Sequence, residues 1–127
     1  MIHTRLHHGP LPPPPPPAYT PGGGATVTFD GVVRPDEAGR TLAALHYQAY
    51  EPMTTHELER LAADTVQRFG LLHLDVTHST GDVPVNTCSF RLTLTAPHRR
   101  EALDAMDHFI ATMKRDVPLW KLPVYRN

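Results

Sequence analysis

Apolar and polar residues alternate along several short segments of the chain, as they do in strands of a sheet with one buried face. In the first of these segments Ala25, Val27 and Phe29 point one way, while the polar residues between them point the other way. A turn is expected at residues 79–82, between the last two segments. The predicted strands are residues 25–30, 42–50, 72–77 and 88–95.

Two longer segments repeat their apolar residues at the spacing of an amphipathic helix. The first helix is predicted to begin at a capping box formed by Thr54 and Glu57 and to end at Gly70. The second is predicted over residues 97–115, and Pro118 must end it because proline cannot continue a helix. The expected order is two strands, a helix, two strands and a second helix, followed by a polar tail. This order predicts an α+β fold in which two helices cover a mostly antiparallel sheet.

The N-terminal part differs in composition from the rest of the chain. Eight of the fourteen prolines lie before residue 22, among them the unbroken run Pro12–Pro17. Such a run favours an extended polyproline helix, and the glycines that follow it favour a flexible joint. We therefore predict a flexible proline- and glycine-rich segment over residues 1–23 and a single domain over residues 24–127. Deleting residues 1–20 is expected to leave the domain folded.

The composition limits the class of protein. The 127 residues include 12 Lys+Arg and 13 Asp+Glu, which gives a formal net charge of -1. This balance argues against a nucleic-acid binder, and no apolar run is long enough to cross a membrane. The single cysteine, Cys88, excludes an internal disulfide and a cysteine-only zinc site, and the alternation predicts that it is a buried, inert thiol. The first residues do not form a secretory signal, so we expect a cytoplasmic protein.

The two lysines are the strongest candidates for chemistry. Ten of the twelve basic residues are arginine, and the only lysines are Lys114 and Lys121. A lysine, unlike an arginine, can become a neutral amine when its surroundings disfavour charge. Because Pro118 forces the chain to turn between them, both amines can converge on one pocket and act as a proton acceptor or a nucleophile. Two unrelated exposed lysines are the alternative.

A second basic cluster lies at the start of the predicted second helix. His98, Arg99 and Arg100 occupy its first turn, where the helix dipole already carries partial positive charge. Basic side chains and free backbone amides together favour a bound anion, most often a phosphate. The alternative is a solvated basic turn paired with nearby carboxylates. Arg34 follows the first predicted strand and contributes only if the fold brings it to the same pocket.

Four segments carry a family resemblance that covers roughly residues 24–121. They read GATVTFDGVVR (24–34), LHYQAYEPM (45–53), APHRREA (96–102) and MKRDVPLWK (113–121). In this order and spacing they resemble the large, catalytic subunit of molybdopterin synthase, the MoaE family. The combination of HRREA with the later lysine and VPLWK is the specific part of the match.

The resemblance implies an α/β-hammerhead fold and a sulfurtransferase. In that family a small ubiquitin-like carrier of the MoaD type delivers sulfur as a C-terminal thiocarboxylate. The sulfur goes to cyclic pyranopterin monophosphate, which becomes the dithiolene of molybdopterin. The resemblance further implies a homodimer flanked by two carriers, a heterotetramer, and neither a cofactor nor a metal ion is expected. By the same resemblance Lys114 and Lys121 are catalytic, and Arg34, His98 and Arg99 bind the phosphate and pterin of the substrate.

Two other functions remain open at this point. One is a non-catalytic relative that keeps the fold and binds a phosphate ligand or a partner. The other is a small phosphate-ester-binding enzyme of ferredoxin-like shape. The two lysines favour the sulfurtransferase. The chain departs from the family pattern at Leu122 and Pro123, which replace a charged pair, and this departure bears on carrier docking.

Overall fold

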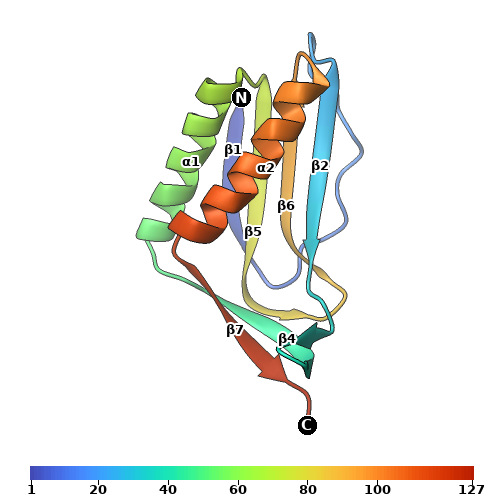
Figure 1. Cartoon of the computed structure of the whole chain (residues 1–127), viewed down its shortest axis with the longest axis vertical. Coiled ribbons are helices and arrows are strands. Elements are labelled where there is room, and N and C mark those ends of the chain that lie inside the picture. The colour runs from blue at the N-terminus through green and yellow to red at the C-terminus, as the bar shows by residue number, and fades with distance from the viewer.

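Seven strands and two helices make up the chain, and the computed structural model describes all 127 residues (Figure 1). The elements are β1 (Ile2–His8), β2 (Ala25–Val32), β3 (Asp36–Glu37), β4 (Arg40–Ala49), α1 (Met53–Phe69), β5 (His73–Pro84), β6 (Cys88–Ala96), α2 (Arg99–Asp116) and β7 (Leu119–Tyr125). Both helices lie on one face of β1, β5, β6 and β2, and a smaller part of the sheet, formed by β3, β4 and β7, extends from its lower end. Neither helix is long and apolar enough to cross a membrane. The predicted α+β fold is confirmed.

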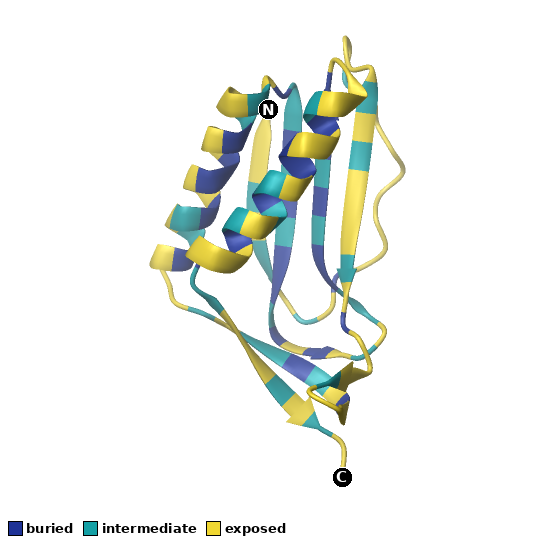
Figure 2. Cartoon of the chain, in the orientation of Figure 1, coloured by how far each residue is buried: buried dark blue, intermediate teal, exposed yellow.

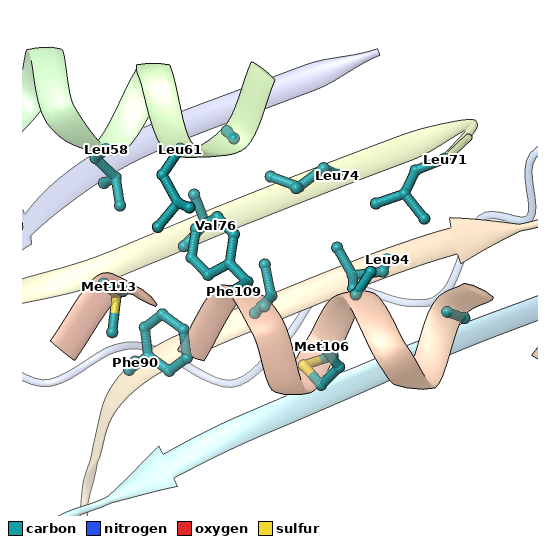
Figure 3. Packing of buried hydrophobic residues seen from close by; sticks show 14 of the residues in the cluster. Leu58, Leu61, Leu71, Leu74, Val76, Phe90, Leu94, Met106, Phe109 and Met113 are labelled. Atoms are coloured by element: carbon teal, nitrogen blue, oxygen red, sulfur yellow. The ribbon is translucent and has the colours of Figure 1, made fainter. Parts of the chain in front are cut away.

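The main core lies between the helices and the sheet. Each helix is buried on the side that faces the sheet and exposed on the other (Figure 2). Phe109 of α2, Leu74 of β5 and Leu94 of β6 have no exposed surface and belong to a cluster of 16 buried residues (Figure 3). Burying a side chain of this size contributes about 1.5–3 kcal/mol, so this layer holds α2 firmly against the sheet.

The helices end as predicted, but α1 does not begin as predicted. Gly70 follows α1 in the left-handed conformation, with a φ of 65°, and α2 ends two residues before Pro118. The predicted capping box is absent, because the hydroxyl of Thr54 donates a hydrogen bond to the carbonyl oxygen of Pro118 instead of capping the helix. The first turn is bound by Glu51, which accepts a hydrogen bond from the backbone N–H of Thr55 at 2.8 Å.

Strand β5 belongs to both parts of the sheet. Its residues 73–78 pair with β6, and its residues 81–84 pair with β4. Gly81 lies at the junction with a φ of 76°, a conformation that glycine adopts without steric strain. The turn predicted at residues 79–82 is therefore wrong, because the turn-forming residues mark a bend within one long strand.

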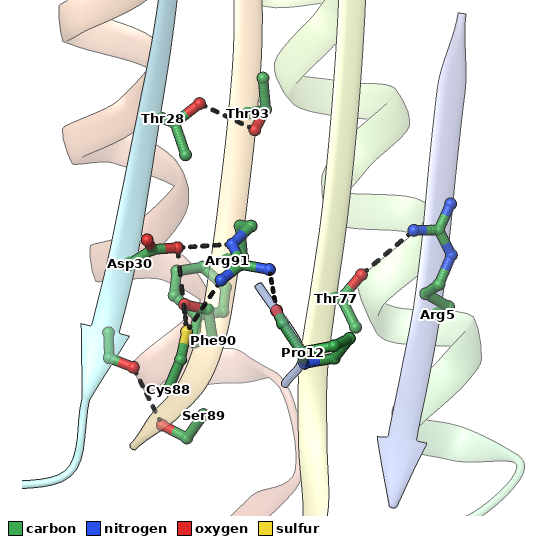
Figure 4. Close-up of polar contacts among 11 residues, drawn as sticks. Arg5, Pro12, Thr28, Asp30, Thr77, Cys88, Ser89, Phe90, Arg91 and Thr93 are labelled. Atoms are coloured by element: carbon green, nitrogen blue, oxygen red, sulfur yellow. Dashed lines mark hydrogen bonds and ion pairs between the residues drawn. The ribbon is translucent and has the colours of Figure 1, made fainter. Parts of the chain in front are cut away.

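The first strand contradicts the prediction that residues 1–23 are flexible. All seven residues of β1 pair in parallel with β5. Leu6 packs against the main core, Leu11 is only 8% exposed, and Arg91 donates a hydrogen bond to the carbonyl oxygen of Pro12 at 2.8 Å (Figure 4). Composition alone suggested flexibility, but an edge strand obtains its hydrogen bonds from a partner that is distant in the sequence.

The C-terminal segment also differs from the prediction. The residues after Pro118, expected to form a polar tail, form β7, which pairs antiparallel with β4. Pro123 is compatible with this strand because β7 has only one neighbour and therefore a free edge. A second, smaller core stabilises this part of the structure and consists of Val33, Leu42, Leu45 and Val83.

Deleting residues 1–8 should destabilise the domain, because it removes the apolar contacts of Leu6 and exposes the edge of β5. We expect the free energy of unfolding to fall by at least about 2 kcal/mol and the melting temperature by roughly 5–10 °C. Thermal denaturation followed by circular dichroism measures both. Pro14→Ser, at an exposed position of the proline run, is the control and should change the stability by less than about 0.5 kcal/mol. An unchanged melting temperature on deletion would restore the prediction of a flexible segment.

Candidate active site

A pocket of about 720 Å³ lies where the C-terminal end of α2 meets the smaller part of the sheet. Three of the predicted site residues line it: Arg34 follows β2, Lys114 lies in the last turn of α2, and Lys121 lies in β7. Pro118 lies between the two lysines, where the chain leaves α2 and turns into β7 alongside β4. The structure therefore brings both lysines and Arg34 to one pocket.

Lys121 is the only one of these three cations that has a carboxylate within 4 Å. Its Nζ lies 3.1 Å from Oε1 of Glu37. The side chains are 49% and 27% exposed, so water screens the pair and its contribution to stability is about 1 kcal/mol or less. The ion pair therefore matters mainly because it directs the Lys121 amine, whereas the amine of Lys114 has no acidic partner.

A tight hairpin places Glu37 at the pocket. Ala38 and Gly39, which connect β3 to β4, both have positive φ, as a two-residue hairpin turn of this type requires. Arg40 lies opposite Glu37 in the hairpin, but its guanidinium stacks over the ring of Tyr125 at 3.7 Å. Because Arg40 is held there, Glu37 is free to pair with the lysine.

The inner wall of the pocket contains a buried histidine. His78, only 6% exposed, donates a hydrogen bond from Nδ1 to the carbonyl oxygen of Ser79 at 2.8 Å. Burial lowers the pKa of His78, and the hydrogen bond to Ser79 opposes this shift only in part. The ring of Tyr47 lies edge-on to His78 at 4.9 Å, and the Tyr47 hydroxyl is 3.1 Å from Oγ of Ser89. The inner wall is thus aromatic and uncharged near neutral pH.

His98 and Arg99 are not part of this pocket. Both are exposed, and they line a separate hollow at the opposite end of α2 together with Arg100. Fifteen residues separate Arg99 from Lys114 along the helix, which corresponds to about 22 Å at 1.5 Å per residue. One chain therefore does not bring the basic helix start to the lysines.

Cys88 is not on the apolar face, where the alternation placed it. The pairing of β2 with β6 shifts register beside Cys88, and the next two residues, Ser89 and Phe90, are both buried. The Cys88 sulfur instead lies 3.8 Å from both Asp30 and Arg91 (Figure 4). Burial raises the pKa of the Cys88 thiol, which disfavours the reactive thiolate.

Two pocket residues were missed by the sequence reasoning. The Ala38–Gly39 turn could have indicated a hairpin that projects Glu37, but its contact with Lys121 joins residues far apart in the chain. His78 was missed because the predicted strand ended at residue 77, although His78 continues the buried alternation of Leu74 and Val76.

The fold and this pocket define a small α+β protein in which two amines and a guanidinium line one pocket. A family model described as MoaE protein matches residues 17–116, so the chain belongs to the MoaE family.

The relatives agree with this assignment. The molybdopterin synthase catalytic subunit of Homo sapiens is 34% identical over 104 residues, which cover 82% of this chain and 55% of that protein. Molybdopterin synthase from Staphylococcus aureus has a similar structure, with a TM-score of 0.79 and 26% identity over 86% of this chain and 80% of that one. A complex of subunits 1 and 2 of molybdopterin-converting factor from Helicobacter pylori contains the same fold, with a TM-score of 0.73 and 22% identity over 98% of this chain and 90% of that one. The chain spans about half the length of the human protein and of several other curated relatives that it matches.

Lowering the pH should destabilise the protein, mainly through the buried His78. Burial lowers the pKa of His78, and also that of His73, below the ordinary value of 6.5, so the unfolded chain binds protons more readily than the folded one. The stability is therefore complete above about pH 6.5 and falls as the pH decreases below it, by at most about 1.4 kcal/mol per pH unit for His78 and by less for the partly exposed His73, whose charge water screens. Urea unfolding between pH 7.5 and 5 measures this slope.

The substitution His78→Leu should make the slope shallower and leave the part due to His73. The matched control is His56→Leu, on the exposed side of α1, which should keep the wild-type slope. Equal slopes for wild type and His78→Leu would contradict the assignment of the pH dependence to this group.

Proposed function

We propose that this chain is the catalytic subunit of a molybdopterin synthase, a sulfurtransferase that converts cyclic pyranopterin monophosphate to molybdopterin. The observation that carries the proposal is the convergence of Arg34, Lys114 and Lys121 on one pocket of a MoaE-family fold. The pocket volume of about 720 Å³ suits a small ligand, and its aromatic inner wall suits a flat ring such as a pterin.

The two lysines take different parts in this proposal. Glu37 holds the Lys121 amine at one side of the pocket by an ion pair of 3.1 Å, and an amine in a fixed position suits proton transfer and the stabilisation of negative charge. Lys114 has no acidic partner, and its amine is the better candidate for holding or activating the substrate covalently. Arg34 supplies a fixed positive charge for the anionic part of the substrate.

A small ubiquitin-like carrier with a C-terminal thiocarboxylate is the proposed sulfur donor. The pocket lies at the surface, where Arg34 and Lys114 are exposed, so an extended C-terminal tail can reach the lysines. The two-subunit complex of the converting factor from Helicobacter pylori supports a partner of this kind for a chain with this fold.

A second copy of the chain completes the proposed site. Arg99 lies about 22 Å along α2 from Lys114, too far to bind the same small substrate from within one chain. In a two-fold dimer that brings the start of α2 of one copy to the pocket of the other, both pockets gain His98 and Arg99 at once. With one carrier at each pocket, the assembly is a heterotetramer.

Replacing either lysine should stop sulfur transfer. Lys121→Ala should abolish product formation and Lys114→Ala should nearly abolish it, each by at least about a hundredfold, because the amine that moves protons or holds the substrate is lost. Lys114→Arg should be as inactive as Lys114→Ala, since arginine keeps the charge but provides no neutral amine. The assay combines the chain, thiocarboxylated carrier and cyclic pyranopterin monophosphate, and it measures molybdopterin.

Arg115→Ala is the matched control for Lys114→Ala. Arg115 is the next residue of α2, is exposed, pairs with Asp116 and does not line the pocket. It should keep wild-type activity. Wild-type product levels from the double lysine variant would overturn the sulfurtransferase proposal and favour the non-catalytic relative.

The variant Arg99→Ala should bind the substrate about tenfold more weakly, as expected for the loss of a charge-assisted hydrogen bond to a phosphate. Calorimetry measures the affinity. At substrate concentrations well below the wild-type Kd, where Arg99→Ala alone should reach only about a tenth of the wild-type rate, mixing it with Lys121→Ala subunits should restore up to about a quarter of the wild-type rate, because half of the randomly formed dimers are mixed and each contains one intact site. Unchanged affinity would remove the phosphate role of Arg99, and a mixture no more active than its components would remove the shared site.

A further inference from the structure

We propose that Thr54 is a positioning residue that fixes the two pocket lysines relative to each other. The proposal rests on the proposed function of Lys114 and Lys121. Thr54 does not line the pocket, but its hydroxyl connects the start of α1 with the turn between α2 and β7.

One hydroxyl makes both connections. The Thr54 side chain has no exposed surface. Its Oγ1 accepts a hydrogen bond from the backbone N–H of Tyr50 at 2.7 Å and donates one to the carbonyl oxygen of Pro118 at 2.6 Å. Tyr50 comes directly after β4, and Pro118 comes directly before β7. β4 and β7 lie side by side below the helices (Figure 1). The Thr54 hydroxyl thus joins the end of β4 to the start of β7.

The turn that Thr54 holds lies in the short stretch of chain that connects the two lysines. Val117 and Pro118 separate α2 from β7, with Lys114 near the end of the helix and Lys121 third in the strand. Pro118 has no N–H and contributes no donor to the turn. The local backbone bonds use the carbonyl oxygens of Met113 and Val117, so the carbonyl oxygen of Pro118 depends on Thr54.

The two sides of the turn are held unequally. Met113 and Val117 are buried in the main core, which fixes the end of α2 and with it Lys114. After the turn the strand is only partly covered, and Trp120, next to Lys121, is 54% exposed. β7 stays paired with β4, whose end is held by the same hydroxyl through Tyr50, so loss of the Thr54 bonds should let the paired strands shift together and carry Lys121, while Lys114 stays in place. A misplacement of about 1 Å in an active site can lower the rate about a hundredfold.

The test separates positioning from a loss of stability. Thr54→Val removes the hydroxyl and keeps the shape, and Thr54→Ser keeps the hydroxyl. Thr65→Val is the matched control: Thr65 is a second buried threonine of α1, whose hydroxyl donates a hydrogen bond to the carbonyl oxygen of Leu61 at 2.7 Å, away from the pocket. Melting temperatures show whether the two valine variants are destabilised to a similar extent.

In the sulfur-transfer assay we expect Thr54→Val to lower kcat about tenfold to a hundredfold with little change in KM. Thr54→Ser and Thr65→Val should stay within about twofold of wild type in kcat. Equal kcat for the two valine variants at matched stability would overturn the proposal, and so would a loss that Thr54→Ser does not rescue.

A second readout does not depend on sulfur transfer. Because the chain has only two lysines, a short amine-reactive cross-linker can report directly on the distance between Lys114 and Lys121 by peptide mass spectrometry. The cross-link yield should fall in Thr54→Val and stay at the wild-type level in Thr65→Val and Thr54→Ser. If the lysine variants prove active, the proposed function fails, but the cross-link yield still decides whether Thr54 positions the two amines. An unchanged cross-link yield in Thr54→Val would overturn the positioning role.

Discussion

The antiparallel pairing of β4 with β7 is the contact on which the pocket depends. β4 pairs with β3, β5 and β7, and in this way it gathers elements whose side chains line the pocket. β3 brings Glu37, β7 brings Lys121, and β4 itself contributes Tyr47 to the pocket wall. Without the pairing of β7 with β4, the chain after Pro118 would have no fixed position relative to α2. Lys114 and Lys121 would then be close in sequence but would not be held at one pocket.

Helix α2 gives the molecule two chemically different ends. Its C-terminal end presents Lys114 to the pocket, and its N-terminal end presents Arg99 to a separate hollow. The helix is packed into the main core along its length through residues such as Phe109, so the separation between its ends is fixed. A rigid helix of this kind cannot fold its two ends onto one small ligand, which is why the proposed site takes Arg99 from a second copy of the chain.

Local patterns predicted the elements that build the main core. The spacing of apolar residues in α1 and α2 and the stop signals at Gly70 and Pro118 are properties of short segments, and the structure follows them. β1 and β7 were missed because their strand character comes from partners that are distant in sequence or from a position at the sheet edge. The bend at Gly81 was taken for a turn because both use the same residue types.

The same distinction between local patterns and contacts distant in sequence applies to the site. The chemical types of Lys114, Lys121 and Arg34 were visible in the sequence, and Pro118 indicated that the lysines could meet. Contacts across the fold were not visible: Glu37 reaches Lys121 over 84 positions, as the ion pair shows. For the same reason the hydroxyl of Thr54 was assigned to a helix cap, although the structure uses it to bind the turn at Pro118.

The proline within β7 has a consequence for how the protein behaves at high concentration. β7 is an open edge strand, and it exposes Trp120, Leu122 and Val124, a combination that invites edge-to-edge association and aggregation. Pro123 interrupts the row of backbone donors that an incoming strand would need. The Pro123 ring thus discourages growth into a continuous intermolecular sheet, although β7 exposes apolar side chains on the face turned away from the pocket.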